Sequence, residues 1–200
     1  MRDRLNKLGL KKLVLILTAL TCEPALAVDM DAIKDKLPLC ISCHSENGVS
    51  VLPNTPSLAG QPDQFLQWQL VFFRAGARKS ELMTPVAENL TNDDVRNLSA
   101  YFASLPPPPA ATSDDDPALT EAGAKAAAGR RCASCHTDNF AGTKATARTA
   151  HQREDYLLKA LTDYKTGVRS GGGMAAMADV AYPLSLDEIK ALAHFLAHYK

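Results

Sequence analysis

Two five-residue motifs place cysteine and histidine side chains at the same spacing in the two halves of the chain. The first is CISCH at residues 40–44, and the second is CASCH at residues 132–136. A bare CxxC pair is compatible with half of a zinc site, a redox-active dithiol or a structural disulfide. None of these explains the histidine that follows directly, whereas CxxCH is the attachment motif of haem c. The two motifs therefore predict two covalently attached haem c groups.

Each residue type in the motif has its own part in haem attachment. The two thiols form thioethers with the two vinyl groups of one haem, and the adjacent histidine supplies a nitrogen ligand to the iron. Zinc is the weaker alternative, because neither half offers a second CxxC or an HxxxH to complete four ligands. The predicted attachment residues are Cys40, Cys43, Cys132 and Cys135, and the predicted proximal iron ligands are His44 and His136.

A methionine is the candidate for the sixth coordination position of each iron. Met83 and Met177 both lie seven residues before the leucine that precedes the last predicted helix of their half. Met174 is the alternative in the second half, because it follows Arg169 by the same five residues that separate Met83 from Arg78. The glycine run at residues 170–173 is the natural place for an insertion, since a loop tolerates changes in length. The pattern therefore favours Met177.

The motifs belong to a longer internal repeat with helical periodicity. Residues 60–78 resemble residues 151–169, and residues 90–102 resemble residues 184–196. Apolar residues recur at helical spacing in each copy, and the [ST]-x-x-[DE] pairs beginning at Thr91 and Ser185 indicate helix starts. The sequence predicts an all-α fold with two tandem helical domains.

Two histidines outside the motifs lie four residues apart in the last predicted helix. The repeat aligns His194 with Ala100 and His198 with Ser104, so the first half has no counterpart for either histidine. We expect both to be exposed residues of that helix.

Composition divides the chain into four segments. Residues 1–27 combine a basic start, a short apolar run and a small-residue end, which is typical of a cleavable signal peptide, although an uncleaved anchor fits the same pattern. The Pro- and Asp-rich stretch at 108–116 is a solvated linker between domains at 28–107 and 117–200. The chain from residue 28 onward has 17 basic and 20 acidic side chains, a net charge of −3. This balance argues against a nucleic-acid partner.

The chain resembles the diheme cytochrome c4 family. The resemblance covers nearly all of residues 28–200 and is carried by both CxxCH motifs, by PSLAGQPDQFLQWQL and its weaker copy, and by AYFASL before the linker. It implies two class I cytochrome c domains with His/Met-ligated irons, Met83 and Met177 being the distal ligands. It also implies a periplasmic electron carrier without catalytic residues, loosely associated with the membrane. Its redox partners would be a membrane oxidase or a quinol-oxidising complex.

One position departs from the family pattern. Pro56 matches the proline whose carbonyl accepts a hydrogen bond from the proximal histidine, whereas its counterpart is Ala147 in a loop without proline. We therefore expect a less restrained proximal side at the second haem, and two haems that differ in potential. Two other functions fit the motifs: a diheme subunit of a larger dehydrogenase, such as a flavocytochrome complex, or a haem enzyme such as a peroxidase with a labile iron position.

Overall fold

The computed structural model describes residues 28–200, and this part of the chain is helical. Its only strand-like pairing is an isolated bridge between Thr143 and Thr146. None of the helices in this part has the length and apolar character needed to cross a membrane. The predicted signal peptide, residues 1–27, lies outside the described residues. The helices are α1 (Met30–Ile33), α2 (Leu37–His44), α3 (Asp63–Arg74), α4 (Met83–Glu88), α5 (Asn92–Ser104), α6 (Pro117–Gly129), α7 (Ala133–His136), α8 (Glu154–Lys165), the 3₁₀ helix η1 (Gly172–Met174), α9 (Ala175–Ala181) and α10 (Leu186–Ala197).

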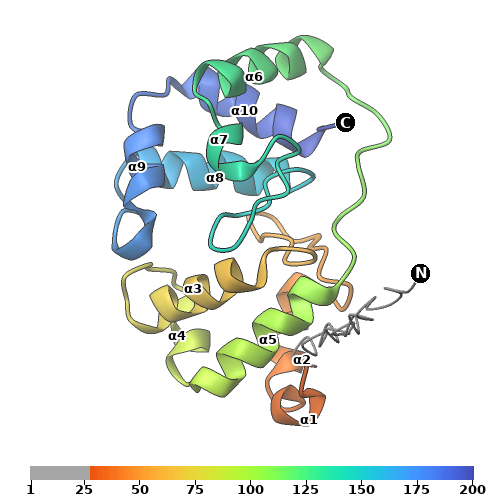
Figure 1. Ribbon diagram of the computed structural model, residues 1–200, viewed down its shortest axis with the longest axis vertical. Coiled ribbons are helices and arrows are strands. Elements are labelled where there is room, and N and C mark those ends of the chain that lie inside the picture. The colour runs from red at the N-terminus through yellow and green to blue at the C-terminus, as the bar shows by residue number, and fades with distance from the viewer. Residues whose placement is uncertain (1–27) are drawn as a thin grey trace, which may run out of the picture.

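The helices form two groups, which we call the first domain (α1 to α5) and the second domain (α6 to α10). Figure 1 shows the groups as two lobes joined by an extended segment that runs along one side. This segment, residues 105–116, begins where α5 ends and leads into α6 at Pro117. The predicted all-α fold is confirmed.

Local sequence signals explain where the principal helices begin and end. Thr91 and Ser185 each form a capping box, in which the hydroxyl accepts a hydrogen bond from the third residue of the helix and that residue's carboxylate accepts one in return. Gly76 and Gly167 follow α3 and α8 with φ angles of +70° and +76°. This left-handed conformation suits glycine and ends each helix.

Each domain has its own apolar core. In the second domain α10 packs across α6, and Gly123 permits the close approach, because a Cβ at this position would lie 2.1 Å from the carbonyl oxygen of Ala191. In the first domain α5 packs against α3 and also against the four-residue helix α1. Buried apolar residues of the first core are Ile33, Phe73, Ala87, Leu90, Val95 and Leu98; those of the second include Ala127, Phe140, Leu157, Tyr164, Leu184, Ile189, Leu192 and Leu196.

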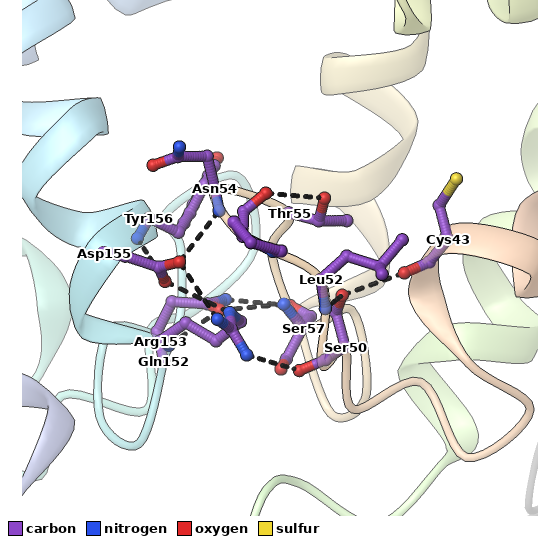
Figure 2. Close-up of polar contacts among 11 residues, drawn as sticks. Cys43, Ser50, Leu52, Asn54, Thr55, Ser57, Gln152, Arg153, Asp155 and Tyr156 are labelled. Carbon is purple, nitrogen blue, oxygen red and sulfur yellow. Dashed lines mark hydrogen bonds and ion pairs between the residues drawn. The ribbon is translucent and has the colours of Figure 1, made fainter.

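The domains meet through reciprocal contacts of equivalent residues. The side-chain amide of Gln152 binds the backbone N–H and carbonyl of Ser57, each at 2.8 Å (Figure 2). In the opposite direction, Gln61 binds the backbone N–H and carbonyl of Arg148 at 3.0 and 2.9 Å. Gln61 and Gln152 are 91 positions apart in the chain, and so are Ser57 and Arg148. The interface therefore has approximate two-fold symmetry. Other hydrogen bonds across it join Arg153 to Ser50, Asp155 to Asn54, Arg78 to Tyr156 and Arg169 to Gln69.

Candidate haem-binding sites

The first CxxCH motif lies on helix α2, which ends at its histidine. The thiol of Cys40 is half-buried and that of Cys43 is exposed, and neither forms a disulfide. His44 is only 5% exposed. Ser45 directly after it has a φ of +66°, an unusual value for a residue with a side chain. The chain therefore turns away at the point where the histidine is presented.

The second motif repeats this arrangement on a shorter helix. Cys132 precedes α7 and is half-buried, Cys135 is exposed, and His136 is the last residue of the helix. Thr137 has a φ of +71° and repeats the turn seen at Ser45. The cysteines of the two motifs thus share their pattern of exposure as well as their spacing.

A backbone carbonyl fixes the tautomer of each motif histidine. His44 Nδ1 lies 2.9 Å from the carbonyl oxygen of Pro56, and His136 Nδ1 lies 2.8 Å from that of Ala147. Because a carbonyl oxygen only accepts, Nδ1 carries the proton and Nε2 keeps its lone pair. Burial lowers the pKa of both imidazoles, and the hydrogen bonds to the two carbonyl oxygens offset part of this decrease. Both rings are therefore neutral at pH 7 and offer Nε2 as a metal ligand.

His136 forms its hydrogen bond to Ala147 although the loop contains no proline. The loop is held by a hydrogen bond from Gly142 N–H to the His136 carbonyl at 2.9 Å and by the Thr143–Thr146 bridge. A Cβ at Gly142, whose φ is +71°, would lie 2.4 Å from the carbonyl carbon of Ala147. Close packing on this glycine therefore restrains the carbonyl that a proline restrains in the first domain.

The cysteine environments argue against the other uses of a CxxC pair. Burial raises the pKa of the Cys40 thiol to about 11 and also raises that of Cys132. Reactive dithiols need a lowered thiol pKa, so these sites do not suit thiol–disulfide exchange. Within residues 28–200, the only cluster of side chains close enough to share a metal ion contains no cysteine, which leaves the motifs without a zinc ligand set.

The candidate distal methionines occupy equivalent positions before the last helix of each domain. Met83 begins α4 and Met177 lies in α9, and both are half-buried against their domain's core. Four residues after each methionine comes a fully buried alanine whose carbonyl accepts a backbone hydrogen bond of 3.1 Å from the leucine at the seventh position. Met174, by contrast, is buried against Arg169, whose Nε lies 3.3 Å from its sulfur.

Comparisons with known proteins agree with this arrangement of motifs. A model of the cytochrome c family matches residues 120–200. Cytochrome c4 of Pseudomonas aeruginosa is 34% identical, the match covering 92% of this chain and 94% of that protein. The chain belongs to the cytochrome c4 family.

Two further likenesses extend over most of this cytochrome c4. The crystal structure of reduced cytochrome c4 from Pseudomonas stutzeri superposes with a TM-score of 0.75 at 32% identity, covering 86% of this chain and 98% of the other. The thiosulfate dehydrogenase electron acceptor of Thiomonas intermedia is 30% identical, the match covering 79% of this chain and 77% of that protein.

The residues of this cytochrome c4 fit two haem c groups. Each domain offers two free thiols on or directly before one short helix and a neutral imidazole that ends the helix. The chain carries two covalently bound haem c groups, one through Cys40 and Cys43 and the other through Cys132 and Cys135. A haem of this kind supplies one reversible electron at its iron, so the protein is an electron carrier.

The expectation that His194 is exposed is wrong. The ring is 3% exposed. Its Nδ1 lies 3.0 Å from a carboxylate oxygen of Glu154 on α8, and its Nε2 lies 3.1 Å from one of Asp114 in the linker. His198 is half-buried and its ring lies 4.2 Å from that of His194, centroid to centroid. Both nitrogens of His194 already face carboxylates, so the cluster ties the linker to the second domain.

Sequence reasoning also missed the part played by Gln61 and Gln152. Their alignment within the repeat was the available signal, but a shared residue type does not reveal that each side chain crosses to the other domain. Both side chains are nearly inaccessible to water, at 5% and 4% exposure. Their contacts lie 87 and 95 positions away in the chain, beyond the reach of any local pattern.

Proposed function

We propose that this cytochrome c4 carries single electrons in a respiratory chain, with one histidine and one methionine on each iron. His44 and Met83 are the proposed ligands in the first domain, and His136 and Met177 in the second. The observation that carries the proposal is that each neutral motif histidine has its Nδ1 committed to a backbone carbonyl. Nε2 is then the ring nitrogen whose lone pair can bind the iron.

The proposed ligand set accounts for the functional class. A thioether ligand favours the reduced iron and raises its potential relative to a second imidazole. With two protein ligands on each iron, no coordination position remains for a substrate, so the protein transfers electrons without catalysing a reaction of its own. The proposed ligand set therefore argues against the peroxidase alternative, which needs an exchangeable ligand.

The segment boundaries and location belong to the same proposal. Residues 1–27 form a cleavable signal peptide that directs the protein to the periplasm. Domains at 28–107 and 117–200 are joined by a linker at 108–116, in keeping with the position of Pro117 at the start of α6. The partners are redox proteins, namely a membrane oxidase or a quinol-oxidising complex, and the protein associates loosely with the membrane.

Replacement of the methionines tests the ligand set. We expect Met83→Ala and Met177→Ala each to remove about half of the sulfur-to-iron charge-transfer absorption of the oxidised protein and to lower one midpoint potential. Met174→Ala is the matched control and should leave both signals intact, because its sulfur faces Arg169. Loss of the signal in Met174→Ala with retention in Met177→Ala would assign the second iron to Met174.

A second candidate function is that of an electron-accepting subunit fixed to a dehydrogenase. The likeness to the thiosulfate dehydrogenase electron acceptor of Thiomonas intermedia favours it. The two functions differ in the stability of the partner complex, since a free carrier forms small and transient contacts. Gentle purification from the native host distinguishes them: a free carrier elutes as a single chain, whereas a subunit elutes with stoichiometric dehydrogenase.

A further inference from the structure

The peptide group between Pro56 and Ser57 forms hydrogen bonds on both of its sides. Its carbonyl oxygen accepts a hydrogen bond from His44 Nδ1 at 2.9 Å. Its N–H donates to Oε1 of Gln152 at 2.8 Å. Gln152 precedes α8 in the second domain, so a single peptide plane joins the histidine of one domain to a side chain of the other.

The second histidine has the same arrangement in the opposite direction. The carbonyl of Ala147 accepts a hydrogen bond from His136 Nδ1 at 2.8 Å. The N–H of the same peptide group, which belongs to Arg148, donates to Oε1 of Gln61 at 3.0 Å. Gln61 lies in the first domain, ahead of α3. Each domain therefore contributes one glutamine to the histidine of its neighbour.

We propose that Gln152 and Gln61 are positioning residues that set the electron density of the proximal histidine in the opposite domain. Gln152 acts on His44 and Gln61 acts on His136. Neither glutamine touches the histidine that it influences. The peptide group that lies between the glutamine and the histidine transmits the effect.

The orientation of both glutamine amides is fixed by what they face. A backbone N–H only donates, so the side-chain atom opposite it is the oxygen. The side-chain nitrogen of each glutamine then donates to the carbonyl of the same residue, at 2.8 Å for Ser57 and 2.9 Å for Arg148. This second bond holds the amide at two points, so its oxygen stays directed at the peptide N–H.

Hydrogen bonds on both sides of a peptide group strengthen each other. An acceptor at the N–H polarises the amide and makes its carbonyl a better acceptor, by roughly 10–30% per bond in condensed-phase estimates. The first chain of bonds is shielded from water, since His44, Ser57 and Gln152 are 5%, 2% and 4% exposed. A stronger bond to Nδ1–H makes the imidazole a more basic ligand. A more electron-rich ligand favours oxidised iron, so each glutamine lowers the potential in the opposite domain.

The inference rests on the proposed ligation by His44 and His136, and the experiment separates the two. Full-length protein with both haems is prepared with ¹⁵N-labelled histidine and reduced. Its Nδ1–H signals are assigned through the contact of His44 with Phe102, whose ring centroid lies 6.4 Å away. Ligation of the iron by each histidine is read from the ¹⁵N signal of its Nε2 in the unaltered protein. An error in the proposed ligation would therefore show before any residue is replaced. Failure of the glutamine effect appears only in the variants.

Gln152→Met removes both hydrogen-bonding groups and keeps the length of the side chain. We expect the His44 Nδ1–H signal to move and to exchange faster with water, and the midpoint potential of the first haem to rise. The second haem should stay unchanged, although the substitution lies in its own domain. Gln61→Met should have the converse effect. Gln152→Glu retains the accepting oxygen and should keep the His44 Nδ1–H signal protected.

Gln64→Met is the matched control, because Gln64 is an exposed residue of α3. It should leave both signals and both potentials unchanged. A shift confined to the haem of the altered domain, an equal shift of both haems, or no shift in either glutamine variant would overturn the proposal. A general loosening of the interface would shift the potentials of both haems equally. This result is distinct from the proposed effect, in which each substitution changes only the haem of the opposite domain.

Discussion

At the scale of single residues, the two motif histidines donate the same hydrogen bond to backbone carbonyls that are held in place in different ways. Pro56 holds its carbonyl in place because its ring fixes φ. Ala147 lacks this restraint, and its carbonyl is held by packing against Gly142. The geometry at the second histidine therefore depends on the absence of a side chain several residues away.

Gly142→Ala should displace the carbonyl that orients His136. The new Cβ would meet the carbonyl carbon of Ala147 at 2.4 Å, and the φ of +71° adds a backbone cost. We expect a loss of about 3 kcal/mol in the free energy of unfolding, part of it overpacking and part the left-handed backbone. The weakened bond to Nδ1 should also raise the potential of the second haem. Denaturant unfolding and redox titration measure the two effects.

Gly167→Ala is the control for the backbone cost alone. Its φ is +76°, and nothing lies within 4 Å of the position that a Cβ would take. It should cost only ~1–2 kcal/mol and leave both potentials unchanged. Equal effects of the two substitutions would show that the contact with Ala147 does not hold the carbonyl.

At the scale of secondary-structure elements, local signals predicted the helices well and their long-range contacts poorly. The capping boxes at Thr91 and Ser185 and the stop at Gly76 act within a few residues, so a local pattern is enough to place them. The burial of His194 depends on Asp114, which is 80 positions away and reaches α10 because the end of the linker leads into α6, the helix that packs across α10. The internal repeat could not predict the burial of His194, since the first domain has Ala100 at the equivalent position.

The stability that the contact between the linker and α10 gives the folded protein should depend on pH. Burial lowers the pKa of His194, but hydrogen bonds to Asp114 and Glu154 and the charges of these carboxylates raise it above its usual 6.5 in the balance. The folded state therefore binds the proton more tightly, and the stabilisation is fully present below pH 6.5 and is lost as the pH rises through the folded pKa. Thermal unfolding should show this loss as a falling melting temperature.

Two neighbouring aspartates allow a matched test of this dependence. Asp114→Asn should weaken the pH dependence on the alkaline side, because it removes one of the two carboxylates that face the His194 ring and leaves Glu154 in place. Asp115→Asn should preserve it, since the Asp115 side chain is 88% exposed and lies 4.0 Å from His198 instead. Identical profiles for both variants would contradict an origin in the Asp114–His194 pair.

At the scale of the whole molecule, the two domains present different surfaces beside their first attachment cysteines. Leu39 and Leu82 are 57% and 76% exposed. The cavity between α2 and α4 is about 210 Å³, and its lining includes Leu39, Cys40 and Pro85. The repeat places Arg131 and Ala176 at the equivalents of the two leucines in the second domain. An apolar surface next to an attachment site suits the brief contacts of electron transfer, so we expect redox partners to dock on the first domain.

Leu82→Glu should slow electron transfer to a physiological partner by roughly tenfold, which corresponds to about 1.4 kcal/mol. A buried charge in the contact would be costly, whereas the haem environment should not change. Ala176→Glu introduces the same charge at the equivalent exposed position of the second domain and should have little effect. Stopped-flow kinetics with the isolated partner measures both rates, and the visible spectrum confirms intact haem sites. A greater effect of Ala176→Glu would place docking on the second domain.

The reciprocal glutamine contacts also bear on how such a chain can evolve. Contacts in which equivalent residues exchange roles are the geometry of a symmetric homodimer, here contained within a single polypeptide. In a homodimer every mutation occurs twice, so the two halves cannot diverge. In this chain a change at Gln61 leaves Gln152 untouched. Natural selection can therefore adjust one half while the other half keeps the ancestral contact. A duplicated carrier can in this way acquire one domain that receives electrons and one that passes them on.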